Sequence, residues 1–238
     1  MHLILTDRLT CVRCGPEFGL ILLARRMEGE RRVLEGFLGC ANCREQYPVA
    51  AGVADLRLPP RDPLASPPPG GDMGEVGEAR GAGGSAQATA DLDAEARRVQ
   101  ALLGILRGPG TVLLLGDAAR LAALLAALLP GMEIVAADGA RHVTESAPVA
   151  PPLVLWPEEE GVSRMVVEGS LPFYSGMLRG VVVDGRGHPG WLEEATRVVA
   201  RLSRVVVLDA PTGVDNTLVQ AGLTVLAAES GTIVAAKG

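Results

Sequence analysis

The chain has 238 residues, a formal net charge of -6 at pH 7 and 48% hydrophobic residues. This length and composition allow two domains with a sizeable core, and the acidic balance argues against a protein that clamps nucleic acid. The most apolar stretch, 121–129, is too short to cross a bilayer. Because no targeting or lipidation motif is recognisable, we expect a soluble, cytoplasmic protein with no membrane or nucleic-acid partner.

The first motif along the chain is a pair of CxxC sequences, formed by Cys11, Cys14, Cys40 and Cys43. Structural zinc is held by four thiolates in tetrahedral geometry, and two CxxC turns fill all four positions. No position is left for a substrate, so the spacing predicts a structural zinc ion that folds a small module. Residues 1–58 carry nearly as many acidic residues as Arg, and this balance makes nucleic-acid binding by the module a poor expectation.

Three other uses of the four cysteines stay open. Two disulfides would need an oxidising compartment, but residues 1–10 include charged side chains and lack the apolar core of a secretory signal. A thioredoxin-like redox pair would stand alone at a helix start. Iron bound as in rubredoxin also uses paired CxxC turns, although Phe18, Phe37 and Tyr47 supply few of the aromatics that such a fold needs. Zinc is the interpretation that the spacing favours.

Short apolar runs at 20–23 and 33–38 flank the charged stretch 25–32, which predicts a β-hairpin between the two CxxC motifs. The zinc site would hold the base of this hairpin. Residues 45–58 then predict a strand, a turn at Gly52 and a last extended piece.

Residues 5–58 resemble the small zinc-binding activator subunit of tRNA, rRNA and protein methyltransferases and its bacterial relatives. The likeness rests on Cys40-Ala-Asn-Cys43, Tyr47-Pro48-Val49 and Gly52-Val53, which follow one another in the family's order. The Pro that the family has after its first cysteine is missing. The resemblance implies a zinc ribbon that covers an apolar edge of a methyltransferase domain.

Residues 59–90 are rich in Pro and then in Gly, with almost no large apolar residue, which predicts a linker. The predicted domains are therefore a zinc-ribbon domain at 1–58 and a second domain at 91–238. A linker of this length reaches on the order of 30 Å, so the sequence does not fix where the zinc module docks.

Helical and strand patterns alternate from residue 91 onward. Helices are predicted at 92–106, from Gly116 to Leu129, and at 191–202. Strands are predicted at 111–115, 133–137, 164–167, 180–184 and 204–209, with 223–228 and 231–236 as a closing pair. Strands of nearly continuous Val and Leu between helices predict an α/β fold: a Rossmann-like, mainly parallel sheet with helices on both faces.

Residues 91–238 resemble a class I S-adenosylmethionine-dependent methyltransferase of the kind that includes the quinone-biosynthesis enzymes. The segments that carry the likeness match the family's glycine loop, its acid followed by LPF, its fourth strand with a His-bearing turn, its LREIARVL helix and its AGF motif. In this chain they are 112–120, 168–173, 181–188, 191–199 and 220–223.

The resemblance implies S-adenosylmethionine as the cofactor. The residues that would bind it are Gly116, Asp117, Ala118, Asp138, Glu168 and Gly169. Ligands of open α/β sheets bind at the carboxyl ends of the strands, where an acid such as Asp138 can hold ribose hydroxyls. An Asp after a strand is equally typical of a helix cap.

The glycine loop departs from the family's pattern. Only Gly116 of three glycines is kept, with Ala118 and Arg120 in the other places and Leu114 where an acid helps to fix the methionine end. Side chains at these positions hinder the close approach of backbone to ligand. Arg120 has three open placements: outward on the helix, in the cofactor pocket, or against a carboxylate.

His188 is the candidate base for methyl transfer and Asp184 the candidate residue that orients it, while a His beside Pro189 is also typical of a plain loop. Two functions stay open. One is an S-adenosylmethionine-dependent methyltransferase with a cis-fused zinc module, acting on a small molecule or a protein. The other is an inactive methyltransferase-like scaffold or regulatory protein with a protein partner. The sequence does not decide whether the protein is an enzyme.

Overall fold

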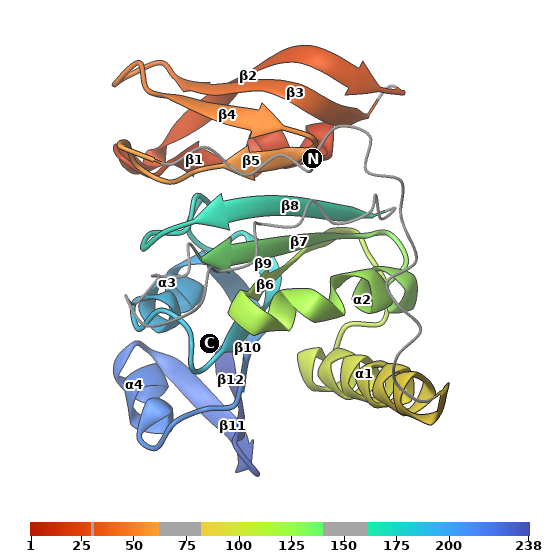
Figure 1. Ribbon diagram of the computed structural model, residues 1–238. Helices are drawn as coiled ribbons and strands as arrows, with labels where there is room; N and C mark the ends of the chain where they lie inside the picture. The colour runs from red at the N-terminus through yellow and green to blue at the C-terminus, as the bar shows by residue number, and fades with distance from the viewer. Residues whose placement is uncertain (30, 62–81, 140–160) are drawn as a thin grey trace.

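The computed structural model describes residues 1–29, 31–61, 82–139 and 161–238 (Figure 1). The strands in these ranges form one 12-stranded sheet in the order β1-β2-β3-β4-β5-β8-β7-β6-β9-β10-β12-β11. The elements of the first half are η1 (Leu3–Arg8), β1 (Thr10–Cys11), β2 (Gly15–Glu28), β3 (Arg32–Cys40), β4 (Gln46–Ala50) and β5 (Val53–Asp55). The strands of the second half are β6 (Gly110–Leu115), β7 (Met132–Gly139), β8 (Val162–Val167), β9 (Leu178–Asp184), β10 (Val199–Leu208), β11 (Leu223–Glu229) and β12 (Thr232–Lys237). Its helices are α1 (Ala82–Leu103), η2 (Gly116–Leu121), α2 (Ala122–Leu128), α3 (Trp191–Val198) and α4 (Val214–Gln220).

The first half contains the predicted hairpin. β2 and β3 pair antiparallel with Leu20 opposite Cys40, so the register places the second CxxC motif beside the strand that follows the first one. β4 then pairs antiparallel with β3, and a turn at Gly52, whose φ is 79°, leads into β5. Positive φ is the region that glycine adopts without strain, which explains the turn at this position.

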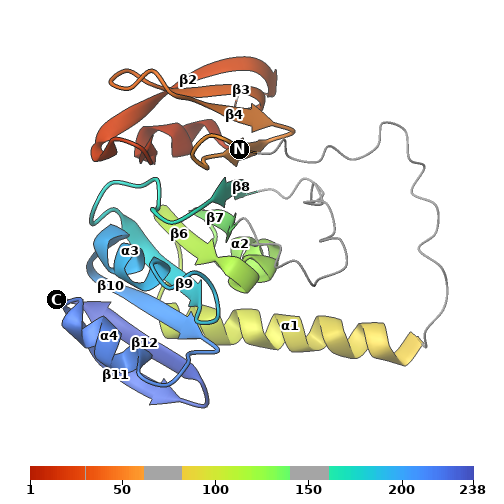
Figure 2. The ribbon, with the colours of Figure 1, turned by 60° about the vertical axis from the view of Figure 1, so that its left-hand side comes forward.

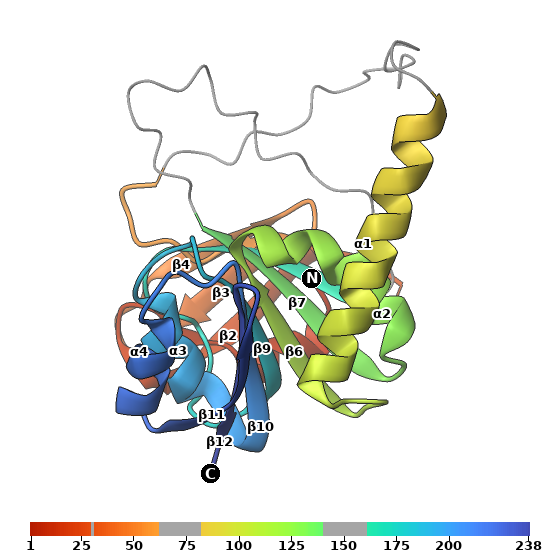
Figure 3. The same ribbon diagram turned by 90° about the horizontal axis from the view of Figure 1, so that it is seen from below.

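The second half is the predicted Rossmann-like fold. β8, β7, β6, β9 and β10 are parallel neighbours, and the strand order reverses between β6 and β9. β12 pairs antiparallel with β10 and β11 with β12, which confirms the predicted closing pair. α1 and α2 pack on one face of the sheet, and α3 and α4 lie on the other (Figure 3). Strands of continuous Val and Leu fit this arrangement because both faces are buried.

The two halves are joined edge to edge. β5 runs parallel to β8, with Ala54 opposite Met165, and the Leu56 N–H continues the ladder by donating to the Val166 carbonyl at 2.9 Å. One hydrophobic core contains buried residues of both halves, including Leu56 and Phe173. The sheet of the N-terminal β module therefore continues into the Rossmann-like sheet (Figure 1, Figure 2).

Several boundaries differ from those that the sequence predicts. α1 begins at Ala82 rather than at residue 92, inside the stretch predicted as a linker, since its many alanines favour helix even without apolar periodicity. α3 ends at Val198, because the following residues join β10. η1 and α4 are not predicted by the sequence patterns. Among the described residues, none of the helices combines the length and apolarity that a bilayer span requires.

Candidate functional site

The four cysteines converge at one end of the N-terminal β module, residues 1–58, which is predicted to bind zinc. Cys11 and Cys40 end strands β1 and β3, and Cys14 and Cys43 lie in the turns that follow. Their sulfur atoms all lie within 4.8 Å of one another, and none is in a disulfide. Two segments that are distant in sequence thus supply a cluster of four thiol ligands.

The spacing of the sulfurs fits a tetrahedral metal ion. The Sγ–Sγ distance is 3.7 Å between Cys11 and Cys43 and 3.8 Å between Cys14 and Cys40. Four sulfurs about 2.3 Å from a central zinc ion lie about 3.8 Å apart at tetrahedral angles. The donor set and the distances therefore suit structural zinc.

Neighbouring side chains support the cluster. The Tyr47 hydroxyl lies 3.3 Å from Cys11 Sγ, and Asn42 Nδ2 donates to Cys14 Sγ at 3.4 Å. Tyr47 is fully buried, and burial together with Cys11 raises the pKa of its hydroxyl, so the hydroxyl keeps its proton and can donate it to a thiolate. The Arg61 guanidinium stacks over the Tyr47 ring at 5.3 Å.

The thiols of the cluster differ in their pKa values. Burial raises the pKa of Cys40, but the backbone N–H groups of Cys43 and Asn42 outweigh it and lower this pKa to about 7. Burial and the neighbouring thiols raise the pKa of Cys43 to about 12. Four thiolates in one place repel one another, and a bound Zn²⁺ removes this cost by stabilising all of the charged forms.

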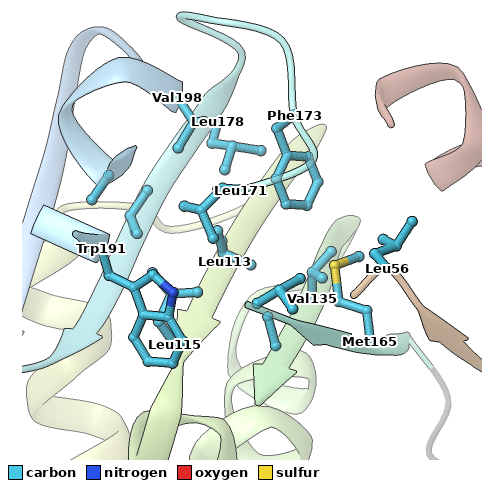
Figure 4. Close-up of a cluster of buried hydrophobic side chains, with 14 of the residues drawn as sticks. Leu56, Leu113, Leu115, Val135, Met165, Leu171, Phe173, Leu178, Trp191 and Val198 are labelled. Carbon is cyan, nitrogen blue, oxygen red and sulfur yellow. The ribbon is translucent and has the colours of Figure 1, made fainter. Parts of the chain in front are cut away.

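The candidate cofactor site lies at the carboxyl ends of the central parallel strands, where the strand order reverses between β6 and β9. Gly116, whose φ is 67°, follows β6, and a Cβ at this position would lie 3.2 Å from Cζ3 of Trp191 and 3.1 Å from Cβ of Asp184. A Cβ on Gly187, after β9, would lie 2.8 Å from the same Trp191 atom. Trp191, which is 3% exposed, therefore packs its ring against the loops that follow β6 and β9, and Figure 4 shows the ring beside Leu115, the last residue of β6.

The loop after β6 makes its polar contacts within the protein. The Asp117 N–H points to Asp184 Oδ2 at 3.5 Å, and Ala118 is buried. Arg120 takes the third of its open placements: it binds both carboxylate oxygens of Glu95 at 2.7 and 2.8 Å and Asp117 at 2.8 Å. This arginine ties η2 to α1 and has two acidic partners of its own.

The remaining predicted cofactor residues follow neighbouring strands. Asp138 is opposite Val166 in the β7–β8 ladder, while its side chain lies outside the described residues. Glu168 is exposed after β8, and Gly169 has a φ of 72°. The register thus places these residues, like Gly116, at the carboxyl ends of the parallel strands. Their role in binding stays a prediction.

The candidate base and its partner each close a local turn. His188 Nδ1 accepts the Gly190 N–H at 3.1 Å, and Asp184 Oδ1 accepts the Arg186 N–H at 2.9 Å. With Nδ1 engaged as an acceptor, the neutral imidazole carries its proton on Nε2 and has no free acceptor nitrogen for a substrate proton. Their catalytic role stays a prediction, and these contacts do not favour it.

Sequence reasoning missed a charged pair on α3. Glu194 Oε2 accepts the Leu171 N–H at 2.6 Å, and Arg197 donates to the carbonyls of Leu171 and Phe173 at 2.8 and 2.7 Å. The two side chains also pair with each other at 2.7 Å. A Glu and an Arg three residues apart on a helix are a visible signal, but the backbone that they hold cannot be identified from spacing.

Comparison with family models and with curated protein sequences yields no match. Among solved structures, the chain is similar to a complex between the Haloferax volcanii Trm112 methyltransferase activator and a candidate methyltransferase, with 16% identity, coverage of 60% of this chain and 74% of that chain, and a TM-score of 0.45. It is also similar to precorrin-6y C5,15-methyltransferase from Geobacter metallireducens, with 15% identity, coverage of 60% of this chain and 87% of that chain, and a TM-score of 0.41. For tRNA (m1A58) methyltransferase TrmI from Aquifex aeolicus, the identity is 15%, the coverage is 60% of this chain and 67% of that chain, and the TM-score is 0.42. The likeness to these methyltransferases concerns the fold alone.

Proposed function

We propose that this protein is a methyltransferase-like scaffold that binds structural zinc, does not use S-adenosylmethionine and acts through a protein partner. The observation that carries the proposal is the contact of the Trp191 ring with the loops that follow β6 and β9. Ligands of doubly wound sheets bind where the strand order reverses. In this chain the buried ring of Trp191 packs against the loop that follows β6 at this end of the sheet.

The contacts around Gly116 support the loss of cofactor binding. Its Cβ position is bounded by Trp191 and Asp184, and the Asp117 N–H faces the Asp184 carboxylate. Backbone N–H groups of such a loop are the donors that an anionic ligand group would use. With the Trp191 ring against this loop, we infer that the loop does not bind S-adenosylmethionine.

The zinc module has a structural role in this proposal. The four sulfurs have the spacing of a tetrahedral zinc site, and β5 of the same module covers the β8 edge of the Rossmann-like sheet. An uncovered β8 would expose unpaired backbone groups. The chain would thus contain in cis the pairing that its resemblance to activator subunits implies between two chains.

Calorimetric titration with S-adenosylmethionine and with its demethylated product tests the proposal. We expect no heat and no thermal shift at millimolar ligand for the wild-type protein. The Trp191→Ala variant tests the reason, because binding gained in that variant identifies the Trp191 ring as the obstruction. Stoichiometric heat with the wild-type protein would contradict the proposal.

A second function is favoured by one observation. Nε1 of Trp191 is buried and has no hydrogen-bond partner among the described residues, and buried donors of folded proteins are nearly always paired. An acceptor atom of a bound molecule would satisfy it. Under this second proposal the bound molecule is S-adenosylmethionine, the protein is a methyltransferase for a small molecule or a protein, and the titration above gives stoichiometric heat with the wild-type protein.

A further inference from the structure

A short segment between β8 and β9 contacts both the zinc module and α3. This linking segment, residues 171–173, follows Glu168 and Gly169 and is buried, with Leu171 2% and Phe173 0% exposed. It belongs to none of the major strands. Its conformation therefore depends on the contacts that it makes on either side.

The zinc module holds the linking segment from one side. The Thr10 N–H donates to the Pro172 carbonyl at 2.9 Å, and Leu9 forms an antiparallel bridge with Phe173. Thr10 directly precedes Cys11 in β1. A metal bond to Cys11 thus fixes the residue next to the one that binds the linking segment.

α3 holds the same segment from the other side. Glu194 accepts from the Leu171 N–H, and Arg197 donates to the carbonyls of Leu171 and Phe173. These bonds are charge-assisted, and the side chains of Glu194 and Arg197 are only 20% and 23% exposed. Moving the linking segment without α3 would leave a largely buried ion pair with unmatched groups, which is costly.

We propose that zinc binding and the placement of Trp191 are coupled through the linking segment. Trp191 is the first residue of α3, and Figure 4 shows its ring on the same face of the sheet as Leu171 and Phe173. Zinc holds β1, β1 holds the linking segment, and the linking segment holds α3 with its tryptophan between the loops after β6 and β9. Arg197 is the positioning residue of this connection.

Coupling between two sites is reciprocal, so breaking the connection must weaken zinc binding. The experiment measures zinc affinity of the full chain by competition with a chromophoric chelator. We expect Arg197→Ala to bind zinc at least about fivefold more weakly than the wild type. The matched control is Arg97→Ala, which removes an exposed arginine that pairs with Asp93 on α1 and is expected to leave the affinity unchanged.

Equal zinc affinity in Arg197→Ala and wild-type protein would overturn the coupling. Should Arg197→Ala fail to fold, Glu194→Gln serves in its place, because it keeps the size of the side chain and removes its charge. Affinity equal to wild type in that variant has the same meaning.

A second measurement follows Trp191 directly. The other tryptophan of the chain, Trp156, is replaced in a Trp156→Phe background, so that acrylamide quenching reports on Trp191 alone. We expect zinc removal to raise the acrylamide quenching of Trp191. We also expect it to accelerate amide hydrogen exchange at 171–177 more than in the central strands β6 and β9. Quenching that is unchanged without zinc, or exchange that rises equally everywhere, would overturn the proposal.

The inference rests on zinc occupancy, which belongs to the proposed function. Metal analysis of the same preparations separates the two. Absence of zinc would overturn both proposals, whereas bound zinc with unchanged affinity in the variants would overturn the coupling alone.

Discussion

The two candidate functional regions of this molecule differ in what forms them. The cysteine cluster is formed by side chains, four thiols with a spacing that suits zinc. The candidate cofactor region after β6 and β9 would bind a ligand through backbone groups, and here the Trp191 ring packs against the loop that begins at Gly116. A site made of ligating side chains is recognisable from those residues, whereas a site made by backbone approach also depends on the size of its neighbours.

Metal removal tests the first region and has the largest expected effect. Structural zinc contributes on the order of 10 kcal/mol to small modules, which is comparable with the whole stability of a typical domain. Cys40→Ser is expected to lose the zinc ion and to unfold the module, measured by metal analysis and circular dichroism. Asn42→Ala keeps all four thiols and is expected to retain zinc with a smaller loss of stability. Wild-type stability of the Cys40→Ser protein would show that zinc binding by the four thiols does not stabilise the module.

Replacement of Trp191 tests the second region. Its ring is 3% exposed and belongs to the core beneath α3. Truncation of a buried tryptophan to alanine costs about 3–5 kcal/mol, so Trp191→Ala is expected to lower the unfolding free energy by this amount in urea denaturation. The control is Leu226→Ala at an exposed position, where a change below about 0.5 kcal/mol is expected. A loss as small as that of the control would mean that Trp191 does not hold the region closed.

The pH dependence of stability sharpens the role of the connection between the regions. Burial opposes ionisation of Glu194, but Arg197 and the Leu171 N–H outweigh it and hold the pKa of this carboxyl below its usual value. A lowered pKa in the folded state stabilises the fold above the unfolded-state pKa, about 4.3, and this contribution is lost as pH falls through the folded-state value.

Glu194→Gln removes that ionisation. We therefore expect the difference in unfolding free energy between wild type and Glu194→Gln to be full at pH 6 and to shrink below about pH 4. Urea denaturation at several pH values measures it. A difference that stays constant with pH would show that the carboxylate charge is not what holds the linking segment.

A small stabilising effect is expected at Leu202. This residue has a φ of 61° and is 87% exposed, in the irregular part of β10 where the pairing with β9 shifts register. A left-handed conformation costs a non-glycine residue about 1–2 kcal/mol, part of which glycine's greater chain entropy offsets. Leu202→Gly is expected to raise the unfolding free energy by about 0.5–1 kcal/mol, and Leu226→Gly in strand β11 to lower it. Thermal denaturation of the two variants measures both changes.

Much of the fold follows from sequence patterns. Val-rich runs such as 181–183 predict buried parallel strands, and the two CxxC motifs predict a zinc cluster because thiol spacing is a local property. The start of α1 at Ala82 could not be predicted from apolar periodicity, since this stretch has almost no large apolar residue.

The relations between distant segments could not be predicted. The pairing of β5 with β8 uses backbone groups that every residue carries, so no side-chain pattern identifies the partner. The contact of Trp191 with Gly116 depends on the length and path of the loop after β9. From the sequence, Ala118 and Arg120 are the residues expected to hinder cofactor binding. In the structure Arg120 binds Glu95, and it is Trp191 that contacts the loop.

The pairing of β5 with β8 has a consequence for biosynthesis. β5 leaves the ribosome long before β8 is translated, and N-terminal units generally fold first. If metal has bound to the cysteines, the N-terminal module is already folded when β8 emerges, and β8 can pair with β5 at once. Metal supplied during translation is therefore expected to increase the yield of correctly assembled protein more than metal added after purification.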